Sequence, residues 1–210
     1  VLMVSDFMKE SLSSCLGPVE NAFCLPPLAY TSSEALNSER NSIFDKGWVP
    51  IGRADRLLGI GDYVALDIID RPVILIRNNE NELNALANSC RHRGAKLLEG
   101  TGTIKGIRCP FHSWLYRTDG TLAAAPRMER SISFQDCSND LIRYDLVERL
   151  GFLFISFQEK PIDIDDWLGN FALLHESWPL SEMITTRTWT REFPFNWKCF
   201  LDVFNEYYHL

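Results

Sequence analysis

Two closely spaced cysteine–histidine pairs constrain this chain more than any other feature of its 210 residues. The first pair is Cys90-Arg91-His92, and the second is Cys109-Pro110-Phe111-His112, which begins after 16 intervening residues. The chain has only four histidines and six cysteines, so chance is a poor explanation for two pairs in the same order. Thiolate and imidazole are both common ligands of transition metals, and the pairs therefore indicate a metal centre held by two loops.

Two kinds of metal centre use two cysteines and two histidines. A tetrahedral zinc site takes such a set, but its usual spacing pairs Cys with Cys and His with His. A Rieske [2Fe–2S] centre needs two thiolates on one iron and two imidazoles on the other. Two loops that each supply one Cys and one His can hold both irons, so the order in this chain favours the iron–sulfur centre. A structural zinc module is the less favoured alternative.

The amino-acid composition and the net charge of the chain are typical of an ordinary globular protein. Apolar residues make up 46% and charged residues 23%, which excludes a disordered chain, a collagen and a coiled coil. The net charge of −7 argues against general nucleic-acid binding. No apolar run approaches the ~20 residues of a membrane-spanning helix, and the first ten residues lack the basic start of a signal peptide. A cytoplasmic protein without membrane association is expected. Four cysteines outside the pairs are expected to be scattered buried thiols: Cys15, Cys24, Cys137 and Cys199.

Short β-prone runs surround the two pairs, and turn residues separate these runs. The predicted strands are 63–69, 73–77, 83–87, 107–109, 114–117, 141–147 and 152–157, with a further strand at 184–192. Helices are predicted at 32–46, with Ser32 or Ser33 as its cap, at 164–178, and over the last residues from Asn196. His175 is expected to be a partly exposed helical residue. The three glycines of the spacer are expected to form turns rather than a nucleotide site: Gly100, Gly102 and Gly106.

A resemblance to the Rieske family lies in the strings CRHRGAKLLEG and CPFHSWLYRTDGTL, which are similar to its two cluster-binding loops. The resemblance implies that Cys90, His92, Cys109 and His112 are the cluster ligands. It also places Gly94 in a tight loop, Asp119-Gly120 in a hairpin turn, and Arg93 and Trp114 as packing around the cluster. Ser113 stands where many relatives have Gly or Ala.

The end of the chain, NWKCFLDVFNEYYHL, resembles the opening of the catalytic domain of Rieske non-heme iron oxygenases. The matching residues are Asn196-Trp197-Lys198, Asp202, and Glu206 followed by His209. The resemblance implies that His209 is the first ligand of a mononuclear Fe(II), with a second His and a carboxylate beyond Leu210 completing a facial triad. It implies that Glu206, where most relatives have Asp, is the carboxylate that bridges His209 and a cluster histidine of a neighbouring subunit, which would be His112 by position.

The predicted fold class is α+β, a mainly antiparallel β Rieske [2Fe-2S] domain followed by the truncated start of an α+β catalytic domain. The expected domains are 1–45, an N-terminal helical or irregular segment; 46–160, the Rieske domain; and 161–210, the start of the mononuclear-iron domain. By resemblance the chain is part of an enzyme, the α subunit of a Rieske mono- or dioxygenase, and is incomplete for catalysis.

The same resemblance implies the reaction and the partners. The cluster would relay electrons to a mononuclear Fe(II) that activates O2, in order to hydroxylate an aromatic ring or oxidatively demethylate a small substrate. The string from Asn205 to His209 leans toward the branch that acts on quaternary amines. Electrons would come from NAD(P)H through a separate reductase or ferredoxin, and the full-length protein is expected to be a homotrimer or to include a β subunit. A Rieske ferredoxin-like electron carrier is the alternative.

Overall fold

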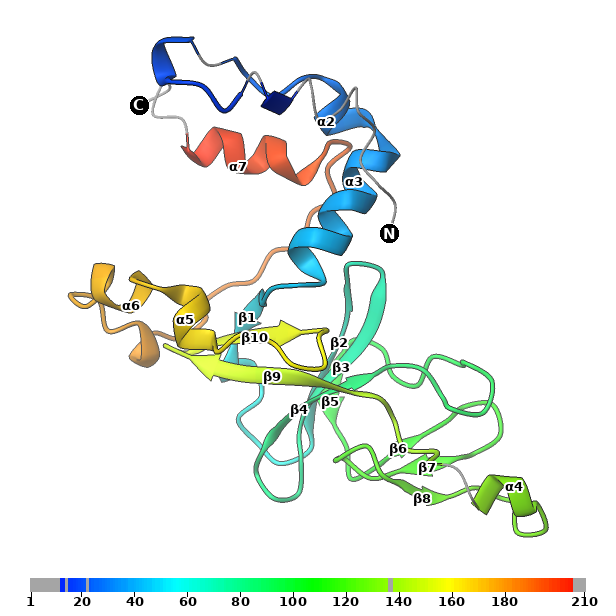
Figure 1. The fold of residues 1–210 in the computed structure, drawn as a ribbon. Helices are drawn as coiled ribbons and strands as arrows, with labels where there is room; N and C mark the ends of the chain where they lie inside the picture. Colours follow the sequence, from blue (N-terminus) through cyan, green and yellow to red (C-terminus); the bar gives the residue numbers. More distant parts are fainter. Residues whose placement is uncertain (1–11, 14, 22, 136–137, 206–210) are drawn as a thin grey trace. The chain divides into compact units, whose positions relative to one another are not determined.

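The computed structural model describes residues 12–205 except 14, 22, 136 and 137 (Figure 1). The chain divides into two compact units. Unit 2 is residues 46–187, and unit 1 combines residues 1–45 with residues 188–210. Each unit is described by itself below.

Unit 2 is built on antiparallel β-structure, which confirms the predicted fold class (Figure 1). Its larger sheet has seven strands in the order β1-β10-β9-β4-β3-β2-β5, and a separate three-stranded sheet has the order β6-β7-β8. The large sheet contains β1 Val49–Arg53, β2 Asp62–Ile68, β3 Arg71–Arg77, β4 Leu83–Ala87, β5 Thr101–Thr103, β9 Arg143–Arg149 and β10 Phe152–Ser156. The small sheet contains β6 Ile107–Arg108, β7 Leu115–Tyr116 and β8 Leu122–Ala124.

The strands predicted from 63 to 157 are all confirmed, and three short strands were not specified in advance: β1, β5 and β8. The turn between β2 and β3 places Ile69 and Asp70 at φ of 51° and 62°. Two successive residues of positive φ are typical of the tight turns that match the twist of a β-hairpin. The hairpin predicted at Asp119-Gly120 is also present, where Gly120 has a φ of 90° and its N–H donates to Arg117 O at 3.0 Å.

Strand β3 is buried on both faces and separates two apolar clusters. Successive side chains of a strand point to opposite faces, so Ile74 and Ile76 join one cluster while Val73 and Leu75 join the other. The first cluster also contains residues of the small sheet and of the two Cys–His loops: Cys90, Leu97, Ile107, Cys109, Trp114 and Tyr116. The loops that carry the candidate ligands therefore pack against the apolar core of unit 2.

The helical predictions are confirmed in part. Ser32 caps α3 (Ser33–Glu39) by accepting hydrogen bonds from the backbone N–H groups of Glu34 and Ala35, and a π-helical turn, Arg40–Phe44, continues it. The helix predicted at 164–178 breaks at Gly169, whose φ is 53°, into α5 (Ile164–Leu168) and α6 (Phe171–Leu174). The remaining helical elements are α2 Leu28–Thr31, α4 Ile132–Gln135, α7 Trp197–Asn205, and three 3₁₀ turns at Val19–Asn21, Ala54–Arg56 and Leu180–Glu182.

One further expectation is wrong. Residues 184–192 form no strand; they are exposed, and within the described residues no strand of either sheet pairs with them. A strand needs a neighbouring ladder to satisfy its N–H and C=O groups, so β-propensity alone does not make one. The helix expected from Asn196 is confirmed by α7, on which Phe200, Val203 and Phe204 are 51%, 61% and 68% exposed.

The cysteines outside the two pairs are not buried as expected. Cys24 is exposed, and Cys15 and Cys199 are half-buried. Cys137 lies outside the described residues. In the part of the chain that the structure covers, no helix has the length and apolar character to cross a membrane.

Gly61, before β2, illustrates how closely the loops pack on the large sheet. It has a φ of 85°, and a Cβ at this position would collide with the carbonyl oxygen of Ile104. Gly61→Ala is expected to lower the free energy of unfolding by about 3 kcal/mol, because the strained φ and the collision with backbone add. The matched control is Gly100→Ala, whose φ of 61° is similar but whose Cβ would meet nothing within 4 Å. Chemical denaturation should show that the control lowers the free energy of unfolding by only about 1 kcal/mol. Equal losses of stability in the two variants would contradict the role of the Ile104 contact.

Candidate metal centre

The first Cys–His loop follows β4 and is closed by backbone hydrogen bonds. Cys90 N–H donates to Ala95 O at 2.9 Å, and Gly94 N–H donates to Cys90 O at 2.8 Å. Gly94 has a φ of 70°, which confirms the tight loop predicted at this position. These bonds hold Cys90 and His92 in one turn before any metal is bound, which is the preorganisation that a metal site needs.

Asn88 clamps both ends of this loop and was missed by the sequence analysis. Its buried side chain accepts hydrogen bonds from Leu97 N–H at 3.0 Å and Leu98 N–H at 2.9 Å, and donates to Leu98 O at 2.8 Å. An amide can make this set of bonds only because it carries both a donor and an acceptor. No local pattern marks an Asn two residues before a cysteine as a clamp, since its partners lie nine and ten residues away.

The second loop connects β6 and β7 and is closed in the same way. Cys109 N–H donates to Trp114 O at 2.8 Å, and Ser113 N–H donates to Cys109 O at 3.1 Å. Ser113 has a φ of 60°, in the left-handed region that glycine adopts at no cost. This conformation means that Ser113 bears backbone strain in this chain.

The two loops bring the four predicted ligands together at one end of unit 2. Cys90 and Cys109 are 3% and 2% exposed, whereas His92 is half-buried and His112 is exposed. The imidazole rings of His92 and His112 lie 4.6 Å apart between centroids, with an angle of 78° between their planes. The thiols therefore face the interior and the imidazoles the surface, which is the separation that a cluster with one Cys-bound and one His-bound iron requires.

The donor set fits a [2Fe–2S] cluster. Nδ1 of His92 is buried and has no hydrogen-bond partner among the described residues, which is costly unless the atom has another ligand. Burial, followed by the nearby charges of His112 and Arg93, lowers the pKa of His92, so its imidazole is neutral as a metal ligand must be. Among the described residues, no three His, Cys, Asp or Glu side chains converge as the ligands of one ion would. A two-iron cluster does not need such convergence, because each iron takes two protein ligands.

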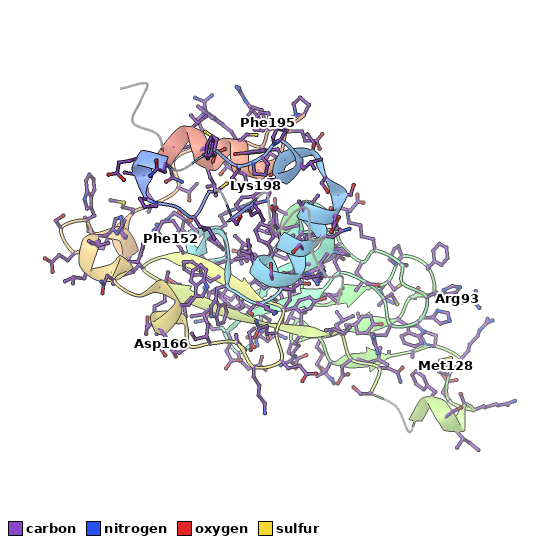
Figure 2. All side chains as sticks on the ribbon, turned by 45° about the horizontal axis from the view of Figure 1, so that its top comes forward. Arg93, Met128, Phe152, Asp166, Phe195 and Lys198 are labelled. Atoms are coloured by element: carbon purple, nitrogen blue, oxygen red, sulfur yellow. The ribbon has the colours of Figure 1, made fainter. Side chains whose placement is uncertain are left out.

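Trp114 packs against the predicted ligands as expected, but Arg93 does not. Trp114 is 3% exposed and its ring stacks on that of His92, with centroids 5.1 Å apart and planes 13° apart. Arg93 is exposed, and Figure 2 shows it at the outer edge of the loops. The stacking fixes the orientation of the His92 ring, whereas Arg93 acts on it only through its charge.

Tyr116 is the second residue that the sequence analysis missed. This fully buried side chain places its hydroxyl 3.3 Å from Cys90 Sγ, and the same hydroxyl accepts a hydrogen bond from Arg91 N–H at 3.1 Å. Burial, followed by the hydrogen bond with Cys90, raises the pKa of Tyr116, so the phenol stays protonated. Because the oxygen accepts from Arg91, its own proton is available for a Cys90 thiolate.

Tyr116→Phe is expected to keep the cluster and to lower its reduction potential. Removing a donor from a thiolate ligand leaves more negative charge at the metal and favours the oxidised form. A difference of about 1 kcal/mol in hydrogen-bond energy between the two redox states corresponds to roughly 40 mV for a one-electron couple. Protein-film voltammetry would measure this shift, with Tyr144→Phe as the control because Tyr144 lies in the other apolar cluster. An unchanged potential in Tyr116→Phe would contradict the hydrogen bond to sulfur.

The Asn196-Trp197-Lys198 string lies in unit 1 and docks the start of α7 against α3. Glu39 accepts hydrogen bonds from Lys198 Nζ at 2.6 Å and from Trp197 Nε1 at 2.9 Å. Asn196 Oδ1 accepts from the backbone N–H of Lys198 at 3.0 Å and from its Nζ at 2.8 Å. Figure 2 shows Lys198 among the side chains of this unit. Asn196-Trp197-Lys198 therefore helps to pack α7 against α3, a role that the sequence analysis did not predict.

A second contact joins the same helix to the N-terminal segment. Tyr30 Oη donates to Asp202 Oδ2 at 2.8 Å, and burial followed by this bond raises the pKa of Tyr30 to about 12. Asp202, the acidic member of the predicted motif, is thus engaged with α2. Glu206 and His209 lie outside the described residues. His175, in unit 2, is partly exposed as expected, but it directly follows α6 instead of lying within a helix, and its Nδ1 lies 2.8 Å from Phe171 O.

Comparison with known proteins identifies the domain. The Rieske [2Fe-2S] domain family matches residues 47–143, which contain both Cys–His loops. The carnitine monooxygenase oxygenase subunit of Escherichia coli strain K12 is 34% identical over 203 residues, covering 93% of this chain and 53% of that protein. The glycine betaine monooxygenase oxygenase subunit of Pseudomonas aeruginosa strain PAO1 is 29% identical over 203 residues, covering 96% of this chain and 47% of that protein.

The fold agrees with these sequence matches. The crystal structure of the quaternary ammonium Rieske monooxygenase CntA with L-carnitine superposes with a TM-score of 0.84 at 31% identity, covering 90% of this chain and 54% of that one. The antiparallel unit with its two Cys–His loops is thus a Rieske [2Fe-2S] domain. Residues 47–143 of this chain thus belong to the Rieske [2Fe-2S] domain family, and the chain is similar over most of its length to oxygenase subunits of Rieske monooxygenases. It spans about half the length of the curated relatives it matches.

Proposed function

We propose that this chain is the electron-accepting part of a Rieske monooxygenase that acts on a quaternary amine. Cys90 and Cys109 would hold one iron of a [2Fe–2S] cluster, and His92 and His112 the other. The observation that carries the proposal is the pair of closed loops that place two buried thiols beneath two adjacent imidazoles, one with an unpartnered buried Nδ1. When bound, such a cluster supplies one-electron transfer at a potential above that of all-cysteine clusters.

The residues around the site have defined tasks in this proposal. Trp114 fixes the ring plane of His92 by stacking, and Asn88 holds both ends of the first loop. Tyr116 donates a hydrogen bond to Cys90 and keeps its proton through the redox cycle. Burial of both thiols excludes water from the sulfur side of the site, while the exposed His112 provides its surface-facing edge.

The substrate class comes from the relatives. Those at 29–34% identity that cover 93% or more of the chain are oxygenase subunits named for carnitine and for glycine betaine, both quaternary ammonium compounds. The same class is indicated by the string from Asn205 to His209. The proposed reaction is an O2-dependent oxidation of such an amine, with electrons from NAD(P)H delivered by a separate reductase or ferredoxin.

The mononuclear iron site is the second half of the proposal. His209 would be its first protein ligand, and Glu206 would bridge His209 and His112 of a neighbouring subunit in a homotrimer, so that one subunit's cluster serves the next subunit's iron. In the assembled enzyme, Glu206→Gln should keep the cluster absorption and reduce the product formed per electron consumed. Full coupling in that variant would remove the bridging role.

Metal and sulfide analysis of the purified chain tests the first half directly. The expected result is two irons and two acid-labile sulfides per chain, a brown colour, and an electron paramagnetic resonance signal after one-electron reduction. One zinc with neither iron nor sulfide would overturn the proposal in favour of a structural zinc module. A ferredoxin-like carrier is the other alternative, and it gives no reason for the Asn196-Trp197-Lys198 string that docks α7.

A further inference from the structure

Charge is distributed very unevenly along this chain. Residues 91–130, which contain most of the two loops and the small sheet, carry eight basic and three acidic side chains, a net charge of +5. The other residues carry 13 basic and 25 acidic side chains, a net charge of −12. A basic segment on an acidic chain focuses the field at one place, so an acidic molecule approaching at random is directed there.

A groove over the small sheet concentrates this positive charge. The groove has a volume of about 400 Å³, and three of the residues that line it are basic while none is acidic. The three are Lys105 before β6, Arg108 within β6, and Arg117 after β7, and all three are exposed. Within the described residues none of them forms an ion pair, and Arg117 makes only a 3.3 Å hydrogen bond to Thr121 Oγ1. Arg117 also lies near enough to Asp119 for its charge to lower the pKa of that carboxyl, so Lys105 and Arg108 are the less compensated charges of the groove.

The groove adjoins the candidate metal centre. Tyr116 lines it, and the hydroxyl of Tyr116 lies 3.3 Å from Cys90 Sγ. Arg108 directly precedes Cys109 in the chain. The groove and Cys90 therefore contact the same residue, Tyr116, and the groove lies close to the predicted cluster ligands.

We propose that the groove formed around Lys105, Arg108 and Arg117 is the docking surface for an acidic one-electron carrier protein. This inference rests on the proposed [2Fe–2S] cluster. One electron leaves the reduced carrier, which is oxidised, and enters the cluster, which is reduced; no proton or group is transferred. Nucleic acid is the other acidic macromolecule that such a groove could attract, but the −12 charge of the remaining chain opposes a long polyanion, and the adjacent redox site gives nucleic acid no role.

Charge reversal with a defined probe tests the surface. The probe is a plant-type [2Fe–2S] ferredoxin, which is acidic and has a potential of about −400 mV, low enough to reduce a Rieske cluster. Two quantities are measured over a range of ionic strength: the Kd for the oxidised probe by titration calorimetry, and the rate at which the reduced probe reduces the chain by stopped-flow absorption. The variants are Lys105→Glu, Arg108→Glu and Arg117→Glu, singly and combined. Lys160→Glu is the matched control, because Lys160 is an exposed lysine that does not line the groove.

The combined variant is expected to bind the probe at least ~10-fold more weakly, to be reduced at least ~10-fold more slowly, and to lose most of the salt dependence. Its visible spectrum should match that of the unaltered chain, because the three side chains are not predicted ligands. Its potential is measured alongside, because negative charge near the cluster lowers the potential and slows reduction without weakening binding. The Kd therefore decides the docking role, and the neutral replacements Lys105→Gln, Arg108→Gln and Arg117→Gln, which change the charge half as much, should give intermediate losses of binding. Unchanged binding and rate, an equal effect of Lys160→Glu, or tighter binding of duplex DNA than of ferredoxin would overturn the proposal. Absence of a cluster from the unaltered chain would instead overturn the proposed function.

Discussion

Replacing Cys109 with alanine should abolish the visible absorption of the purified chain and leave less than about a tenth of its iron. Cys109 is 2% exposed, and the backbone hydrogen bonds that close its loop do not depend on its side chain. The loop therefore keeps its shape but loses one of two thiolates, and no other cysteine of the described residues belongs to this apolar cluster except Cys90. An iron left with one thiolate has no protein ligand to replace the other.

The matched control is Cys24→Ala, which removes an exposed thiol from unit 1. It should retain full absorption, iron and sulfide. His92→Ala should behave like Cys109→Ala, since it removes the buried Nδ1 that has no hydrogen-bond partner among the described residues. Both ligand variants should also unfold at lower temperature than the cluster-bound chain, because a ligand that binds only the native state stabilises it. A visible spectrum that survives Cys109→Ala or His92→Ala would disprove the ligand assignment.

The strands and the loops could be predicted because their signals are local. Each of these signals spans only a few residues of the sequence. This holds for the alternating apolar residues of a strand, for the turns at Asp70 and Gly120, and for the two Cys–His strings. The physical rule that decides each of them, the period of a strand or the φ of a turn, acts over the same short range. This is why strands β2, β3 and β4 begin and end close to their predicted bounds.

The features that the sequence analysis missed or predicted wrongly depend on residues that are distant in sequence. Asn88 and Tyr116 act through residues that lie 9 to 26 positions away, so no spacing rule reveals them. Residues 184–192 have strand propensity but no strand beside them in the described part of the chain. The role of Asn196-Trp197-Lys198 depends on Glu39, which is more than 150 residues away. The β-propensity of a segment depends on its own residues. Strand pairing, and side-chain hydrogen bonds such as those of Asn88, depend instead on which distant segments the fold brings together.

The ion pair between Lys198 and Glu39 carries the largest predicted effect on unit 1. Their side chains are only 11% and 16% exposed, and the Nζ–Oε1 distance is 2.6 Å. Lys198→Met keeps most of the aliphatic volume but leaves the Glu39 carboxylate with Trp197 Nε1 as its remaining side-chain donor. Removing one partner of a buried pair typically costs about 3–5 kcal/mol, so local opening of α7 should become easier by roughly 3 kcal/mol. Hydrogen exchange of the amides in α7 should then be about 100-fold faster, because local opening controls their protection.

The double variant Glu39→Gln with Lys198→Met separates the cost of an unpaired charge from the worth of the pair. The glutamine introduced in this variant carries no charge, yet its side-chain oxygen can still accept from Trp197 Nε1, so no buried charge is left without a partner. Exchange in α7 should return to within about tenfold of the unaltered chain, which corresponds to roughly 1 kcal/mol. Lys160→Met serves as the control for removal of an exposed lysine and should not change exchange in α7. If Lys198→Met exchanges like the unaltered chain, the pair contributes no stability to unit 1; if the double variant is as fast as the single one, direct attraction rather than the unpaired charge accounts for the loss.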